Sequence, residues 1–304
     1  MSKQEKWSDY WQNEGATGEV FVNKDGHKHS ALKQFWQHQV ANLTSGDSLI
    51  DLACGAGSIF ADLPEQHGLA LSAADLSAVA LQHLVAKFPQ VETTVCSADD
   101  LPFDDNQFDM VVSQFGIEYA GPEAFMEAYR ILKPGGRMTV LCHIQDGYID
   151  SKNKMELVGA ELAHALNFVA RAKQVTAAVF ANQPDEITVA MDEFVSVEPL
   201  LAASVNKSSS GPHVHLYNGF KQLFMKRQAY TQQDILDWLD GMDQEIQKSI
   251  ERLTSMRKAA QSESNMQAIA ERLGKPNQQV DYKPLVLPDH NLPVAWHFEL
   301  IKAD

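Results

Sequence analysis

Short apolar runs alternate with amphipathic segments through the first half of the chain. Five runs rich in Val, Ile, Leu and Phe predict strands, over residues 48–53, 69–75, 91–98, 108–115 and 137–144. The segments 30–43, 76–88 and 122–133 place apolar residues at helical spacing, with Ser30 as the expected N-cap of the first. The turn KPGG, 133–136, is expected to end a helix and open the fifth strand. Strands alternating with helices favour a parallel sheet covered on both faces.

The alternation of predicted strands and helices ends near residue 145. Residues 155–172 predict a helix whose apolar stripe contains Met155, Val158, Leu162, Leu166 and Val169. Residues 206–213 read as a loop. Thr231 and Asp234 form an expected capping box for a long helix. Its apolar stripe is Ile235, Leu239, Met242, Ile246, Ile250 and Leu253.

The last segment returns to strand periodicity. Residues 280–288 and 293–304 predict two strands that pair across the turn DHN. We therefore expect residues 1–145 to form N-terminal helices and an α/β core, and residues 146–280 to form a helical insertion. Residues 281–304 then complete the core sheet.

Composition narrows the class of protein. With 304 residues and 44% hydrophobic residues, the chain can form one large domain with an insertion or two modest domains. No apolar run approaches the roughly 18 residues of a membrane span, and the polar start has no signal-peptide core. Three separated cysteines suit free thiols in the cytoplasm, which is the expected location.

Charge argues against nucleic acid as a partner. The net charge is −15, and residues 1–150 hold 9 basic against 21 acidic residues. Residues 151–280 are nearly balanced, with 14 against 15. Because nucleic-acid binding depends on neutralised phosphates, a small-molecule acceptor is the better expectation.

The stretch LIDLACGAGS, 49–58, carries the clearest chemical signal. It is a strand followed by a small-residue turn, but the dinucleotide fingerprint G-x-G-x-x-G is not matched because Phe60 stands at the third glycine. Asp51 would repel a phosphate near this turn. Asp75, at the end of the second predicted strand, is placed to accept both hydroxyls of a ribose.

Two further motifs follow in order, SADDLPF at 97–103 and ILKPGGR at 131–137. Together the four resemble the class I S-adenosylmethionine-dependent methyltransferases, in particular the broad group that contains the quinone C-methyltransferases and many small-molecule enzymes. The resemblance covers about residues 30–145 and the terminal strand pair. It implies an α/β fold, a Rossmann-like seven-stranded mostly parallel sheet with helices on both faces and a large helical insertion before the last two strands.

The resemblance also implies a set of residues that bind S-adenosylmethionine. The methionine end would lie against the segment from Asp51 through the turn, and the ribose and adenine against residues that follow the second and third strands. The sulfonium would lie over the end of the fourth strand. The residues carried over are Asp51, Ala53, Cys54, Gly55, Gly57, Asp75, Leu76, Ser97, Ala98, Asp99, Gln114 and Phe115.

Two of these residues depart from the family pattern. Ala53 replaces the usual first glycine, a mild change if its φ is negative. Ser97 stands where an acid or amide often binds the adenine amino group, and Asp99 is the alternative partner.

Methyl transfer needs alignment of the acceptor, exclusion of water and, for some acceptors, a base. His143, Glu118 and Tyr119 follow the fifth and fourth strands at the expected acceptor edge and are the catalytic candidates. Packing roles for them remain open. Trp7, Tyr10 and Trp11 form an aromatic cluster that either folds over the cofactor or covers the sheet.

Two other features carry less weight. His213 and His215 form an H-x-H pair without a third ligand at matching spacing, so no metal site is predicted. The stripe over 235–253 suits intramolecular packing, and a homodimer seam is the alternative.

The sequence thus predicts a methyltransferase acting on a small or medium-sized organic acceptor, with O-, N- and C-methylation unresolved. Residues 146–280 would form a cap that binds the acceptor. The alternatives are a non-catalytic partner subunit that binds the cofactor or its demethylated product, and a protein methyltransferase. The acidic first half argues against an RNA substrate, and SQFG, 113–116, replaces the N-P-P-Y-type tetrapeptide used for exocyclic amines.

Overall fold

The computed structural model describes residues 3–13, 29–64, 68–276 and 278–303. The chain divides into two compact units. An α/β unit contains Met1–Ile149 and Ala259–Asp304, and a helical unit contains Asp150–Lys258. Each unit has its own buried apolar cluster.

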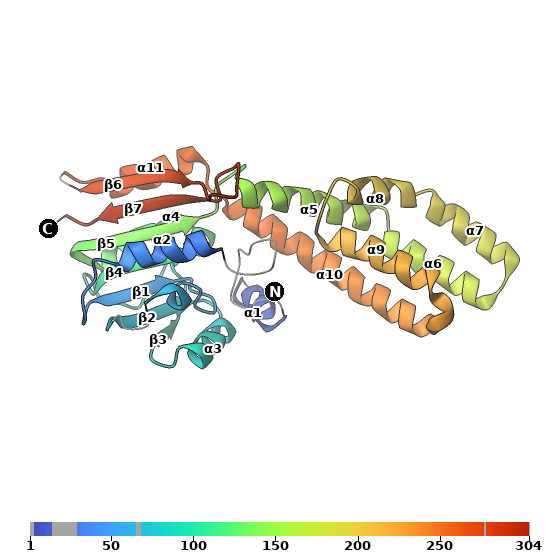
Figure 1. The fold of residues 1–304 in the computed structure, drawn as a ribbon, viewed down its shortest axis with the longest axis horizontal. Coiled ribbons are helices and arrows are strands. Elements are labelled where there is room, and N and C mark those ends of the chain that lie inside the picture. The colour runs from blue at the N-terminus through green and yellow to red at the C-terminus, as the bar shows by residue number, and fades with distance from the viewer. Residues whose placement is uncertain (1–2, 14–28, 65–67, 277, 304) are drawn as a thin grey trace. The chain divides into compact units, whose positions relative to one another are not determined.

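A seven-stranded sheet in the order β3-β2-β1-β4-β5-β7-β6 forms the α/β unit (Figure 1). Neighbours from β3 to β5 are parallel, and β7 runs antiparallel to both β5 and β6. This confirms the predicted α/β fold with two late strands. The strands are β1 (Ser48–Leu52), β2 (Ala70–Asp75), β3 (Glu92–Val95), β4 (Phe108–Gln114), β5 (Leu132–Cys142), β6 (Gln279–Leu285) and β7 (Ala295–Ile301).

The KPGG segment lies inside β5 rather than before it. Strand β5 already pairs with β4 at Leu132, and the register shifts before pairing resumes at Arg137. Gly135 adopts a φ of 74°, which glycine allows at little cost. The predicted turn is therefore an irregularity within the strand.

Helices cover both faces of this sheet (Figure 1). Phe35 of α2 contacts His297, and Trp36 bonds to Gln114, so α2 lies on the face to which those strand residues point. Helices α4 and α11 pack on the other face. The helices of the unit are α1 (Lys3–Asn13), α2 (Ser30–Val40), α3 (Ala78–Lys87), α4 (Pro122–Ile131) and α11 (Glu263–Leu273), with 3₁₀ turns η2 (Phe60–Asp62) and η3 (Ile117–Tyr119). Residue His29, not Ser30, is the N-cap of α2, and it makes no side-chain cap bond.

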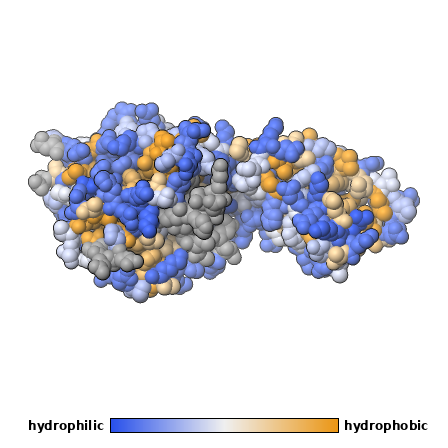
Figure 2. Space-filling view, viewed as in Figure 1, coloured by the Kyte–Doolittle hydropathy of each residue, from blue (hydrophilic) through white to orange (hydrophobic). Residues whose placement is uncertain are grey.

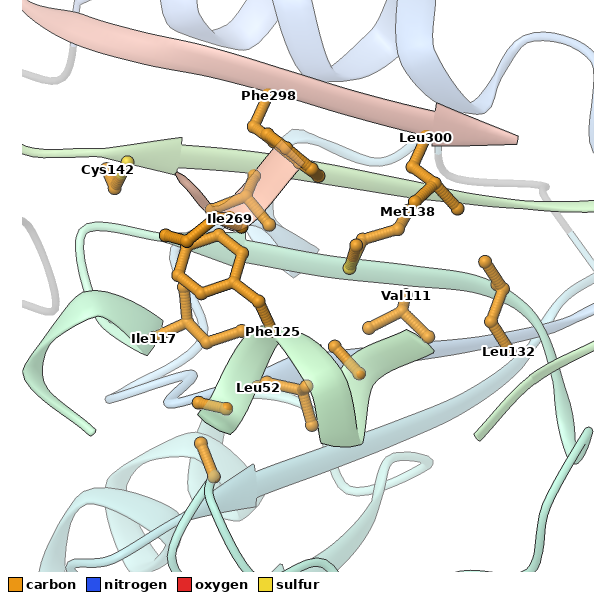
Figure 3. Close-up of a cluster of buried hydrophobic side chains, with 14 of the residues drawn as sticks. Leu52, Val111, Ile117, Phe125, Leu132, Met138, Cys142, Ile269, Phe298 and Leu300 are labelled. Carbon is orange, nitrogen blue, oxygen red and sulfur yellow. The ribbon is translucent and has the colours of Figure 1, made fainter. Parts of the chain in front are cut away.

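The main core lies between the sheet and helices α4 and α11. Phe125 of α4 packs edge-on against Phe298 of β7, with ring centroids 5.7 Å apart. Ile269 of α11 and Met138 of β5 belong to the same cluster (Figure 3). Because α11 buries its apolar face here, the α/β unit resumes at residue 259 and not at 281 as the sequence suggested. The pattern of α11 alone could not show which unit it packs on.

The helical unit consists of six α-helices with one shared core. The start of α5 lies beside the end of α10 (Figure 1), where Arg257 Nε bonds to Asp150 Oδ1 at 3.1 Å. The helices are α5 (Tyr148–Ala165), α6 (Phe168–Ala181), α7 (Pro184–Val195), α8 (Glu198–Val205), α9 (Pro212–Met225) and α10 (Gln232–Ala259), with η4 (Arg227–Ala229).

Predictions for this unit are correct in part. The capping box is confirmed, since Thr231 N donates to Asp234 Oδ2 at 2.8 Å and Asp234 N to Thr231 Oγ1 at 3.1 Å. The stripe of α10 faces the core, with only Ile250 partly exposed. The single helix over 155–172 is wrong, because Asn167 adopts a φ of 48° and separates α5 from α6.

The predicted stripe of that helix is also wrong at its start. Met155 and Val158 are more than half exposed. Figure 2 shows apolar and polar residues interspersed over the face in view of this unit. The predicted loop ends at Gly211, since α9 already begins at Pro212. Among the described residues, no helix has the length and apolar content to cross a bilayer.

Candidate functional site

The carboxyl ends of β1, β2, β4 and β5 carry most of the polar residues predicted for the site. Asp75, the last residue of β2, is buried and accepts two backbone bonds, from Gly55 N at 2.9 Å and Ser77 N at 2.8 Å. Burial raises the pKa of Asp75, and N–H groups of Ser77, Gly55 and Leu76 oppose that rise. The Asp75 carboxylate therefore joins the glycine turn after β1 to the start of α3.

Ser77 is a site residue that the sequence reasoning missed. Its hydroxyl caps α3 by accepting from Ala80 N at 3.3 Å, and it is fully buried. An Asp-x-Ser before a helical pattern is an N-cap signal that could have found it. Capping fixes the orientation of the N–H that Asp75 binds.

The turn after β1 needs small residues because of the protein's own side chains. Gly55 has a φ of 54°, and a Cβ there would lie 2.4 Å from the Trp11 ring. At Gly57, with a φ of 85°, a Cβ would meet Leu84 at 3.1 Å. The Trp11 ring packs directly against the backbone of the turn, and this contact is one reason why the turn needs a glycine.

Ala53 is strained, contrary to expectation. Its φ is 52°, in the left-handed region that an L-residue enters at a cost of about 1 kcal/mol or more. A Cβ at Gly116 would lie 2.7 Å from the Ala53 Cβ, so the turns after β1 and β4 are in tight contact. The replacement of the usual glycine is therefore not mild.

Helix α1 places its aromatic residues over this edge. Trp11 is buried with Ala56 and Ala80, and Tyr10 packs against the same cluster. Trp7 lies edge-on to Tyr119, with ring centroids 5.0 Å apart. The cluster thus packs on the glycine turn, which is the segment predicted to lie against the methionine end of the cofactor.

Two of the predicted cofactor residues, one within β1 and one in the turn after it, are buried. Asp51 is 1% exposed and Cys54 7% exposed. Burial raises the pKa of the Cys54 thiol well above its ordinary value, and the charges of Asp75 and Asp51 add to the effect. Cys54 is therefore a packing residue and not a thiolate.

The residues predicted to hold the adenine follow β2 and β3. Leu76 is half-buried and Ala98 is buried. The hydroxyl of Ser97 donates to the exposed Asp99 carboxylate. The two alternative adenine partners are thus bonded to each other, with Asp99 as the charged group of the pair.

Gln114 and Phe115 end β4 as predicted. Gln114 Oε1 accepts from Trp36 Nε1 at 2.5 Å, and Gln114 Nε2 donates to Ser58 Oγ at 3.1 Å. Phe115 is buried with a φ of 55°. Trp36 and Ser58 are contacts the sequence did not predict, because they depend on the placement of α2 beside the turn.

The three catalytic candidates lie together. Glu118 Oε1 is 2.7 Å from His143 Nδ1 and also accepts from the His143 backbone N at 2.8 Å. Tyr119 lies edge-on to the His143 ring, with centroids 5.8 Å apart, and Phe115 is 4.8 Å from it. The register of β4 with β5 brings η3 and His143 to one edge.

His213 and His215 both lie on α9, but their side chains pack in different surroundings. His213 is buried, and a Cβ on Gly159 would lie 2.3 Å from its ring. His215 lies edge-on to Trp238, with centroids 6.0 Å apart. Within the described ranges no three His, Cys, Asp or Glu side chains are grouped to hold a metal ion.

The residues at this edge fit the cofactor that the resemblance implies. Gly55 N and Ser77 N bond to different oxygens of Asp75, and a carboxylate has about four acceptor positions, so acceptor capacity remains for the ribose. Asp51, within β1, and Asp75, at the end of β2, place two carboxylates near the turn, which disfavours a pyrophosphate there by charge.

Comparisons with known proteins agree with this arrangement. Residues 49–136 match the family described as a methyltransferase domain. A ubiquinone/menaquinone biosynthesis C-methyltransferase of Rickettsia felis is 31% identical over 157 residues, covering 44% of this chain and 62% of that protein. Its counterpart in Rickettsia bellii is 32% identical, over 37% of this chain and 50% of that protein. The chain thus spans less than two thirds of these curated relatives.

Among solved structures, geranyl diphosphate C-methyltransferase from Streptomyces coelicolor is 21% identical, with a TM-score of 0.40 over 48% of this chain and 66% of that chain. The family match covers β1 to β4, the start of β5 and every edge residue described above except Trp7, Tyr10, Trp11, Trp36 and His143. Residues 49–136 of the α/β unit therefore form a methyltransferase domain of the class I S-adenosylmethionine-dependent type.

Proposed function

We propose that the protein transfers the methyl group of S-adenosylmethionine to a small or medium-sized organic acceptor. The observation that carries this proposal is the Asp75 carboxylate, buried at the end of β2 and bonded to Gly55 N at 2.9 Å. Asp75 would hold the ribose beside the turn, which would leave the ends of β4 and β5 to the acceptor. Ligands of open α/β sheets lie at this edge.

The cofactor supplies an activated methyl group, and the residues of this chain bind and orient it. Asp75 would hold the ribose, the turn through Gly55 and Gly57 the methionine end, and Ala98 with Ser97 or Asp99 the adenine. Gln114 is held by Trp36 and Ser58 at the end of β4, next to the expected sulfonium. Trp11 of α1 shields the turn from water.

Two measurements test this proposal. Calorimetry should show that S-adenosylhomocysteine binds and NAD does not. Incubation with methyl-labelled cofactor and fractionated cell extract should then label a small molecule that mass spectrometry identifies. Binding of NAD without S-adenosylhomocysteine would contradict the proposal. Cofactor binding without transfer to any fraction would favour the non-catalytic partner subunit, and label in the protein fraction would favour a protein methyltransferase.

Reduced quinones are the first acceptors to try, because the curated relatives are ubiquinone/menaquinone C-methyltransferases. The surplus of acidic residues supports a small molecule over nucleic acid. A cytoplasmic location remains the expectation from the cysteines, all three of which are free. A homodimer is less favoured, since the stripe of α10 is used in the core of its own unit.

The helical unit is the proposed source of acceptor-binding residues. Leu162 and Phe168 are unsuitable probes, because Phe168 is in the core of the unit and Leu162 packs against it. Met155 and Val158 are better probes, since they are exposed one turn apart on α5. Changing both to Ser should raise the KM for the acceptor and leave cofactor affinity unchanged. Val189→Ser, at an exposed valine of α7, is the matched control.

A further inference from the structure

Two hydrogen bonds join His143 to the carboxylate of Glu118. One carboxylate oxygen, Glu118 Oε1, accepts from both the backbone N and the ring Nδ1 of His143, at 2.8 Å and 2.7 Å. The side chains are 1% and 0% exposed. The carboxylate therefore fixes both the position and the rotation of the imidazole.

This contact also favours one tautomer. An ionised carboxylate only accepts hydrogen bonds, so beside an ionised Glu118 a neutral His143 would carry its proton on Nδ1 and its lone pair on Nε2. Among the residues that the structure describes, nothing within hydrogen-bond reach pairs with His143 Nε2. A buried polar atom without a partner is costly, and a reactant that binds there would repay that cost.

The surroundings of the ring are aromatic. Phe115 and Tyr119 contact the imidazole, and Trp7 of α1 lies against Tyr119. Two titratable side chains of η3, Glu118 and Tyr119, contact the ring. These aromatic side chains suit a flat, apolar acceptor, and they keep water from the Nε2 lone pair.

We propose that His143 Nε2 is the proton acceptor of the reaction, and that the acceptor is a phenol or enol. This rests on the proposed function. A neutral amine already has a free lone pair and needs no base, whereas a phenol or enol holds its proton at neutral pH and reacts faster once it is removed. Glu118 is a positioning residue that also stabilises the imidazolium.

The step balances as follows in atoms and electrons. The hydroxyl proton passes to His143 Nε2, the oxygen forms a bond to the methyl carbon, and the carbon–sulfur bond breaks with its electron pair going to sulfur. Where the ring carbon beside the oxygen is methylated instead, the proton leaving that carbon returns to the oxygen. In both cases one proton remains on His143 and is released to solvent afterwards.

A matched pair of acceptors tests the chemical class. We expect transfer of labelled methyl to 1-naphthol and none to 1-naphthylamine, which has the same ring. His143→Gln should lower kcat about 100-fold or more with unchanged affinity for S-adenosylhomocysteine. Glu118→Gln retains an acceptor for the backbone N and should lower kcat less. Methylation of the amine alone, or full activity of His143→Gln, would overturn the proposal.

Nitrogen NMR on histidine-labelled protein provides a test that needs no acceptor, with His143→Gln used for assignment. Nδ1 of His143 should be protonated and Nε2 bare. The Nε2 resonance should differ between the complex with cationic S-adenosylmethionine and that with neutral S-adenosylhomocysteine, while His213 stays unchanged. A protonated Nε2, or identical spectra in the two complexes, would overturn the proposal even if neither naphthalene reacts. Failure of wild type to bind either compound would contradict the proposed function instead.

Discussion

The two units of the chain bury different kinds of side chain. The α/β unit buries Asp51, Asp75, Glu118 and His143 at the carboxyl edge of its sheet. The core of the helical unit is almost wholly apolar, and its buried carboxylate, Asp150, is neutralised by Arg257 at 3.1 Å. Burying an ionisable group is costly unless other atoms satisfy it. The concentration of such groups in one place therefore distinguishes the α/β unit, where we expect the cofactor to bind, from the helical unit, whose interior mainly stabilises its own fold.

His213 is the exception in the helical unit. It is fully buried, neither ring nitrogen has a hydrogen-bond partner in the described part of the chain, and its ring packs on the bare backbone of Gly159. Burial lowers the pKa of His213, although the charge of Glu156 opposes this. Unlike His143, it has no carboxylate on a ring nitrogen, so it packs as a neutral aromatic ring.

The largest expected effect is on cofactor affinity and distinguishes the two edges of the sheet in the α/β unit. Asp75→Asn removes the charge that would hold the ribose hydroxyls, each such bond being worth about 1.5–3 kcal/mol. Affinity for S-adenosylhomocysteine, measured by calorimetry, should fall at least about tenfold. The control is Asp109→Asn, which loses a Lys133 ion pair of 2.7 Å at the opposite edge of the sheet and should bind normally. Equal affinity in both variants would place the ribose elsewhere.

A steric change in the helical unit should alter stability without altering cofactor binding. Gly159→Ala places a Cβ against the His213 ring and should lower the free energy of unfolding by about 1–3 kcal/mol. Gly241 lies on α10 with open space around the position of a new methyl group. Gly241→Ala should therefore raise the free energy of unfolding by about 0.5–1 kcal/mol. Thermal unfolding compares the two. A matching loss of cofactor affinity in Gly159→Ala would show that the units are not separate in function.

The pH dependence of stability should carry the signature of His213. Its folded pKa is below its unfolded value, so between the two the unfolded chain binds more protons. The free energy of unfolding therefore has its full value above the pKa of the unfolded chain, about 6.5. It decreases as the pH falls through that pKa toward the lower pKa of the folded protein. The slope is at most about 1.4 kcal/mol per pH unit. His213→Met should flatten the curve of urea midpoints, and an unchanged slope would refute the assignment.

The smallest effect concerns the strained turn. Ala53→Gly relieves a φ of 52° and should raise the free energy of unfolding by about 0.5–1 kcal/mol. Ala56→Gly, in the same turn but without a positive φ, should be destabilising in the same urea titration. Loss of stability in Ala53→Gly would mean that contacts of its methyl group outweigh the backbone strain.

Sequence predicted the fold better than it predicted the site. Periodicity located every strand, because most are short apolar runs, although β5 begins at Leu132, before the predicted run. It could not assign α11, since an amphipathic face does not reveal its partner. Asp75 was identifiable from its place after β2. The pairing of Glu118 with His143 was not, because it depends on the β4–β5 register across 25 residues. The φ of Ala53 and the position of Trp11 over Gly55 likewise depend on contacts distant in sequence.

Hydrogen exchange with and without S-adenosylhomocysteine tests the central claim most directly, namely that the cofactor binds at the carboxyl edge of the α/β unit. Protection is predicted in the turn 53–58, at Asp75–Ser77, in 97–100 and at the end of β4. The amino edge, at Ser48 and Asp109, should be unaffected. Protection confined to residues 150–258, or absent from the turn while calorimetry records binding, would contradict the account.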